Sequence, residues 1–154
     1  MTITKLSAEE TRESGFTHKA AIKYTDLNTT AALTATLVLL SGMVAGFLVR
    51  NAAFRLVSGF VGASITTLTL KVGWNGATVD DDDGLIAAAS VLTANSPILA
   101  GDATGAAFAT LRTGFAPQES AAIEAVFTAI GANLTALTAG EVHVYLTVSD
   151  LSKL

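Results

Sequence analysis

Two segments of the chain alternate strictly between apolar and polar residues. The alternating apolar residues are Leu68, Leu70, Val72 and Trp74 in the first segment and Val142, Val144, Leu146 and Val148 in the second. Successive side chains of a β-strand point to opposite faces of its sheet. The pattern therefore predicts two strands, each with one buried and one exposed face.

Six further segments have the β-branched and aromatic composition of strands. They are residues 19–25, 33–40, 44–50, 52–58, 108–113 and 121–130. Turn-forming residues separate them, among them Ser41-Gly42 and Asn75-Gly76. Residues 121–130 also have some helical propensity, but Val126, Phe127 and Ile130 favour a strand. Together these segments predict an all-β fold of about eight strands.

The length and the charge content limit the organisation of the chain. A chain of 154 residues suffices for one domain. The first 16 residues are polar, so we expect an N-terminal arm over 1–16 and one β-sandwich domain over 17–154. Charged residues make up 14%, against about 25% in an average protein. So little charge predicts an oligomer that covers much of its surface.

Composition also argues against several partners and chemistries. The chain has 9 Lys and Arg against 13 Asp and Glu, a net charge of −4, which is unfavourable for binding nucleic acid or anionic lipid. It has no cysteine, which excludes disulfides, thiolate catalysis and Cys-ligated metals and suits a reducing cytoplasm.

One uncharged stretch, residues 27–49, is long enough to cross a membrane and holds Gly42 and Gly46 at the spacing of paired membrane helices. Its threonines and the Ser41-Gly42 turn argue against a membrane span. We expect two buried strands joined at Ser41-Gly42, and a membrane-associated protein is the less favoured alternative.

Four consecutive acidic residues, Asp80 to Asp83, precede an Ala-rich run. Acidic residues favour the positive end of a helix, so one short helix is expected here. The run does not fit a calcium-binding EF-hand loop, because Val79 and Ser90 occupy the first and twelfth positions. We therefore expect no metal and no cofactor.

The residues predict no catalytic site. The two histidines, His18 and His143, have no spacing to a carboxylate that indicates a metal site or a catalytic pair, and His143 falls on the exposed phase of its strand. The sequence closest to a nucleophile elbow begins at Gly62 and has Thr66 where the motif needs a second glycine. We expect a protein that is not an enzyme.

With these residues in view, the chain resembles the head decoration (capsid cement) proteins of tailed bacteriophages that have a jelly-roll β-sandwich. The similarity covers about residues 17–150, and three stretches carry it: residues 24–28 (YTDLN), 64–73 (SITTLTLKVG) and 126–142 (VFTAIGANLTALTAGEV). The last stretch is the most specific, but it contains no catalytic residue.

The resemblance implies a virion protein, made in the host cytoplasm, that sits as a homotrimer on the outside of the capsid and bridges subunits of the major capsid protein. A trimeric tail or baseplate component is the alternative. A polar arm on such a protein is expected to contact the capsid. Its candidate contact residues are Lys5, Glu9, Glu10, Arg12 and Glu13.

Overall fold

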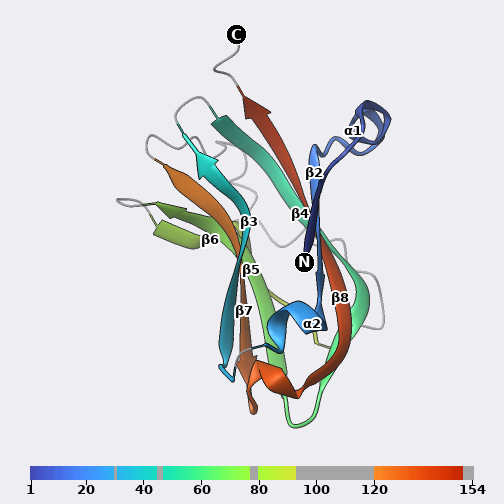
Figure 1. Cartoon of the computed structure of the whole chain (residues 1–154), viewed down its shortest axis with the longest axis vertical. Coiled ribbons are helices and arrows are strands. Elements are labelled where there is room, and N and C mark those ends of the chain that lie inside the picture. The colour runs from blue at the N-terminus through green and yellow to red at the C-terminus, as the bar shows by residue number, and fades with distance from the viewer. Residues whose placement is uncertain (30, 45–46, 77–79, 93–119, 151–154) are drawn as a thin grey trace.

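The computed structural model describes residues 1–29, 31–44, 47–76, 80–92 and 120–150. These residues form two antiparallel sheets of four strands each, packed as a sandwich (Figure 1). The all-β fold predicted from the sequence is confirmed.

The first sheet has the order β1-β2-β8-β4, with bounds Thr2–Lys5, His18–Lys23, Leu137–Asp150 and Phe47–Gly62. The second sheet has the order β3-β7-β5-β6, with bounds Thr34–Met43, Ala121–Ile130, Thr67–Gly76 and Asp80–Ser90. The helical segments are α1 (Ala8–Ser14), α2 (Tyr24–Leu27) and the short 3-10 helix η1 (Leu134–Ala136). Consecutive strands from β2 to β5 alternate between the two sheets.

The core lies between the sheets and follows the alternation in the sequence. The fully buried side chains include Leu68, Leu70 and Val72 of β5, and Val142 and Val144 of β8 face them from the other sheet. Burial of each such side chain contributes about 2 kcal/mol to the stability of the fold. No polar or charged residue of the described ranges is buried. Both strands predicted from strict alternation are confirmed.

The predicted turn at Ser41-Gly42 is wrong, because β3 continues through both residues to Met43. Gly42 has a φ of 67°, and the pairing with β7 shifts register between Leu40 and Met43. A bulge in an edge strand thus absorbs the irregular backbone that the sequence suggested as a turn.

Residues 47–50 and 52–58 of the two strands predicted over 44–50 and 52–58 belong to one long strand, β4, which begins at Phe47; residues 45–46 lie outside the described residues. A register shift between Val49 and Asn51 interrupts the pairing of β4 with β8 but does not end the strand. The predicted strand over 19–25 is shorter, because helix α2 begins at Tyr24. The predicted strand over 108–113 lies outside the described residues.

The expected helix after Asp80 is also wrong, because these residues form strand β6. β6 pairs with β5 and buries Leu85 and Ile86 in the core. Gly84 lies against the ring of Trp74, where a Cβ would come within 2.3 Å of the ring. Tertiary pairing and this close packing outweigh the helical propensity of the Ala-rich run.

Residues 34–43 of the uncharged stretch belong to β3 and residues 47–49 begin β4. In the part of the chain that the structure describes, no helix has the length and the apolar character needed to span a membrane.

Candidate functional site

The N-terminal residues expected to form a polar arm have regular structure. β1 pairs antiparallel with β2, with Ile3 opposite Ala20, although every residue of β1 is exposed. Backbone hydrogen bonds therefore order this segment without buried apolar side chains.

Helix α1, between β1 and β2, is closed at both ends. The Glu10 backbone N–H donates to the Ser7 hydroxyl (3.3 Å), and the Glu10 carboxylate accepts from the Ser7 backbone N–H (2.9 Å). This is a capping box. At the other end, Gly15 has a φ of 76°, and its N–H donates to the carbonyl of Thr11 (2.8 Å). These caps explain how a seven-residue helix with no buried residue keeps defined ends.

Strand β8 fixes the position of α1. The Thr147 hydroxyl donates to the carbonyl of Gly15 (2.7 Å), and the Thr17 backbone N–H donates to the carbonyl of Leu146 (2.9 Å). On the other side of the helix, the Leu6 N–H donates to the carbonyl of Thr17 (2.8 Å). The helix is therefore attached to the first sheet at both of its flanks.

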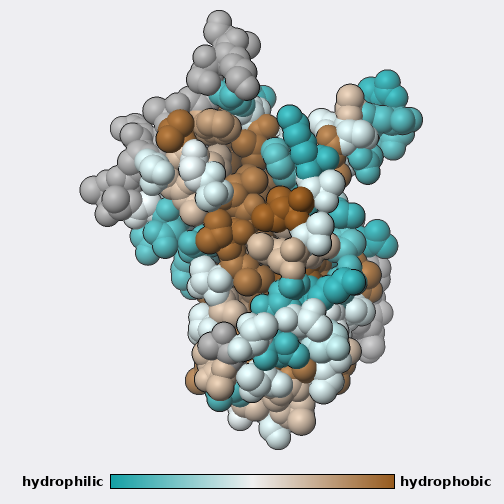
Figure 2. All heavy atoms as spheres, viewed as in Figure 1, coloured by the Kyte–Doolittle hydropathy of each residue, from teal (hydrophilic) through white to brown (hydrophobic). Residues whose placement is uncertain are grey.

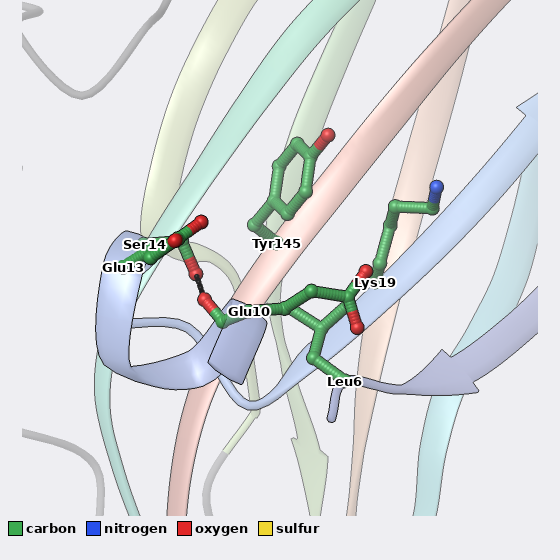
Figure 3. Close-up of a pocket in the computed structure, with 6 residues that line it drawn as sticks. All are labelled: Leu6, Glu10, Glu13, Ser14, Lys19 and Tyr145. Carbon is green, nitrogen blue, oxygen red and sulfur yellow. Dashed lines mark hydrogen bonds between the residues drawn. The ribbon is translucent and has the colours of Figure 1, made fainter. Parts of the chain in front are cut away.

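A pocket of about 310 Å³ lies between α1 and the outer face of the first sheet (Figure 3). We call it the α1 pocket. Its lining residues are Leu6, Glu10, Glu13, Ser14, Lys19 and Tyr145. This volume is at the lower end of the range for small-molecule sites, about 300 to 1,000 Å³.

One wall of the α1 pocket is aromatic. The ring of Tyr145 lies 5.6 Å from the ring of Phe16 at an interplanar angle of 43°, and 6.3 Å from the ring of His143. Such tilted ring pairs hold one another in place. The outer face of β8 thus presents a rigid aromatic surface next to the carboxylates of α1.

Charge in the α1 pocket is mixed. The hydrogen bond from the Ser7 backbone, and then that from the Ser7 hydroxyl, lower the pKa of Glu10, and the positive charge of Lys19 acts in the same direction. Glu13 has no hydrogen bond or ion pair within the described ranges. The pocket therefore has both acidic and basic side chains in its lining, and the Ser14 hydroxyl beside them donates to the backbone carbonyl of Glu10 (2.6 Å).

The structure brings together only part of the candidate arm. Glu10 and Glu13 line the α1 pocket, whereas Glu9, Arg12 and Lys5 do not. Sequence reasoning missed Leu6, Lys19 and Tyr145, which join the site through sheet pairing between distant segments. A signal for α1 was present, because Ser7 and Glu10 have the spacing of a capping box.

Neither histidine is among the residues that line the α1 pocket, although His143 contacts Tyr145. His143 Nε2 lies 2.8 Å from Glu141 Oε1 on the outer face of the first sheet, so this histidine does have a carboxylate partner, contrary to the prediction from the sequence. The side chain of His143 is 17% exposed, so it is more buried than its place on the polar side of the strand predicted. Burial, and to a smaller extent Lys5, lower the pKa of His18.

The four aspartates of β6 were the other candidate for chemistry. Lys71 forms an ion pair with Asp82, and a hydrogen bond with Asp81, followed by burial, raises the pKa of Asp83. Within the described residues, no group of three or more His, Cys, Asp or Glu side chains is arranged to hold a metal ion.

Apolar side chains also remain exposed on β1 and next to or on β3, two of the four edge strands in the described part of the sandwich. Ile3 is 43%, Leu33 50% and Val38 43% exposed, Leu33 immediately preceding β3. Figure 2 shows hydrophobic residues gathered between β3 and the strands of the first sheet. We call Ile3, Leu33 and Val38 the apolar edge.

Comparison with known proteins identifies no relative: no protein-family model, no curated protein and no solved structure matches the chain.

Proposed function

We propose that this protein is a structural component of a bacteriophage particle: a homotrimer that binds the outside of the capsid and stabilises it by bridging subunits of the major capsid protein. The proposal rests on the resemblance of residues 17–150 to phage head decoration proteins. It gains support from the β-sandwich fold and from strands that alternate between two sheets, as in a jelly roll.

The apolar edge is the observation that carries the proposal. Open strand edges with exposed apolar side chains pair with other chains, and monomeric proteins usually block them with charge or proline. Neither β1 nor β3 contains a proline, and the single charged residue of the two strands is Lys5. The bulge of β3 lies beyond Val38, so within the described ranges residues 34–38 have no bulge, charge or proline, and a partner surface that covers this part of the edge accounts for its exposed apolar side chains.

In this proposal the apolar edge contacts the capsid lattice, and the three copies within one trimer amplify each weak contact by avidity. The low charge of the chain suits a surface that is largely covered. The net negative charge suits the exterior of a shell, away from packaged DNA.

Co-sedimentation with purified tail-free heads of the phage that encodes the chain tests the proposal. We expect the wild-type protein to sediment with heads, and Val38→Lys to reduce the bound fraction about ten-fold, because a charge on the edge strand opposes close packing. Ile130→Lys is the matched control, since Ile130 is 60% exposed but lies on the interior strand β7.

Wild-type protein that never sediments with heads contradicts the proposal. Binding to purified tails instead of heads indicates the alternative role, a tail or baseplate component.

A further inference from the structure

Strand β1 and helix α1 contribute no side chain to the core. Every residue of β1 is exposed, none of α1 is buried, and among the described strands β1 pairs with β2 alone. Segments with few buried apolar contacts open locally while the rest of a domain stays folded. We call residues 2–14, which comprise β1 and α1, the N-terminal flap.

Gly15 gives the N-terminal flap a hinge. Its φ of 76° lies in the left-handed region, which glycine adopts at little cost. The Thr147 hydroxyl of β8 donates to the Gly15 carbonyl, so this residue stays attached to the sandwich when β1 separates from β2. In Figure 1, α1 projects from the body of the molecule beside β2, where a rotation about Gly15 would move it.

Thr17 joins the flap to two strands of the first sheet. Its carbonyl accepts from the N–H of Leu6, which follows β1 (2.8 Å). Its hydroxyl donates to the Leu146 carbonyl (3.1 Å) and accepts from the Val148 N–H (2.9 Å), both in β8. The same hydroxyl lies 2.8 Å from Nδ1 of His18, the first residue of β2. This network holds the imidazole ring of His18 at the end of β2, between β1 and β8.

The same network determines which ring nitrogen takes up a proton. The hydroxyl hydrogen of Thr17 is used in its bond to Leu146, so Nδ1 of His18 supplies the hydrogen of the 2.8 Å contact. Within the described ranges, the other ring nitrogen, Nε2, has no hydrogen-bond partner. A proton taken up by His18 therefore binds Nε2 and leaves the bonds of Thr17 intact, so the ring keeps its position when it becomes charged.

In that position a protonated His18 faces a second positive charge. His18 has the strand phase of the buried Ala20, so its ring lies on the inner side of the first sheet. Lys5 of β1 is its register partner, and register partners have side chains on the same side of a sheet. From β8 the register partner of His18 is the apolar Leu146, whereas Lys19 lines the α1 pocket on the other side. Within the described chain, Lys5 is therefore the charged group that a protonated His18 meets.

We propose that His18 is an acid-sensitive latch: protonation of its ring releases the N-terminal flap, which opens about Gly15 while the sandwich stays folded. Like charges directly opposite each other in paired strands are destabilising. The element that separates is β1, because β2 also pairs with β8 and places side chains in the core, whereas β1 does neither. The latch operates within one copy of the chain and does not depend on the proposed function.

The sign of the pH dependence follows from the closed state. Burial, and then Lys5, lower the pKa of His18 there. An open flap exposes the ring and removes Lys5, so the pKa of His18 returns toward its ordinary value near 6.5. Below pH 6.5 the open state therefore binds more protons than the closed state, and the flap opens more as the pH falls toward the pKa of the closed state.

Opening of the flap changes two surfaces of the molecule. The edge of β2 that pairs with β1 becomes free to bond to another strand. Glu10 and Glu13 of α1 move away from Lys19 and Tyr145, which line the same pocket (Figure 3). Acid therefore uncovers a strand edge and opens the α1 pocket in one step.

Amide hydrogen exchange of the full chain at pH 5 and pH 7 tests the latch, with each rate corrected for the effect of pH on an unprotected amide. An ordinary carboxylate titrates near about pH 4, so this pair of conditions mainly tests histidine. His18→Asn keeps a side-chain N–H for Thr17 but takes up no proton. Lys5→Glu replaces the facing cation with an anion. His143→Asn, which changes the other histidine of the chain, is the matched control.

From pH 7 to pH 5 we expect the protection of the flap to fall about five-fold in the wild type and in the control. In His18→Asn the protection of the flap is the same at both pH values. In Lys5→Glu the response reverses, and acid raises the protection, because opposite charges at register partners attract. Exchange of the flap depends less on urea than exchange of β8, because a local opening exposes little surface.

Other results overturn the latch. Wild-type protection of the flap that is equal at the two pH values contradicts it, and so does a Lys5→Glu variant that responds to acid as the wild type does. Exchange of the flap that rises with urea as steeply as that of β8 shows that the flap opens only with the whole domain. If His18→Asn does not fold, Lys5→Glu still decides, because Lys5 is exposed. Each of these results leaves the capsid role intact.

Discussion

Thr147 donates a 2.7 Å hydrogen bond to the carbonyl of Gly15, joining residues that are 132 positions apart. The contact holds the end of α1 against the central strand β8 of the first sheet, beside the ring pair of Phe16 and Tyr145. The backbone of the N-terminal helix is thereby attached to the first sheet.

Thr147→Val should loosen α1 without unfolding the sandwich. Valine keeps the branched shape but cannot donate to Gly15, and one such hydrogen bond contributes about 1 kcal/mol. We expect faster amide hydrogen exchange over residues 8–16. Thr138→Val is the matched control, since the Thr138 hydroxyl donates to the carbonyl of Val61 (3.3 Å) far from α1. Equal exchange of α1 in the two variants would show that Thr147 does not hold the helix.

Ser7→Ala should raise the pKa of Glu10 toward its ordinary value, because the hydroxyl bond that favours the charged carboxylate is lost while the Ser7 backbone bond remains. A lowered folded-state pKa stabilises the fold above the unfolded value near 4.5, and this contribution is lost as the pH falls through the folded pKa. NMR titration of the Glu10 side chain measures the change. Glu9 is the internal control, and a Glu10 pKa that does not move would contradict the capping box.

Gly140→Ala should destabilise the protein more than Gly42→Ala. Gly140 has a φ of 130°, and an added Cβ would lie 2.5 Å from the ring of Phe60. Gly42 has a φ of 67° but nothing within 4 Å of that position. We expect the free energy of unfolding, measured in urea, to fall by about 3 kcal/mol in Gly140→Ala and by about 1 kcal/mol in Gly42→Ala. Equal losses would mean that Phe60 does not press on Gly140.

His18 should make stability depend on pH. Burial, and then Lys5, lower its pKa in the folded state, so the unfolded state binds more protons below the ordinary value near 6.5. Stability is therefore full above pH 6.5 and falls as the pH drops toward the folded pKa. Urea unfolding at pH 5 and pH 7.5 gives the difference in the free energy of unfolding between the two pH values. We expect His18→Asn to have a smaller difference than the wild type, and His143→Asn serves as the comparison. If the difference is unchanged in His18→Asn, other groups cause the pH dependence.

Local pattern was sufficient to predict the strands that supply the core. Leu68 to Trp74 and Val142 to Val148 alternate because one face of each strand is buried, and that requirement is visible in the sequence. Gly84 shows where local pattern fails, since its packing against Trp74 depends on the pairing of β6 with β5.

The candidate site was less predictable for the same reason. Leu6 and Lys19 meet Tyr145 because β2 pairs with β8, and a single sequence does not specify which distant strands pair. The capping box of Ser7 and Glu10 involves residues three positions apart, so its pattern can be seen in the sequence and indicates the start of a helix. The low apolar content of the first 16 residues nevertheless predicted an arm without structure of its own. Backbone pairing of β1 and the caps of α1 supply the order that apolar burial does not.

A density map of the intact phage head tests the central claim most directly. The account predicts β-sandwiches of this chain in clusters of three on the outer surface of the capsid, each cluster touching more than one subunit of the major capsid protein. Heads that carry no such density while the chain is found at the tail, or outside the particle altogether, would contradict it.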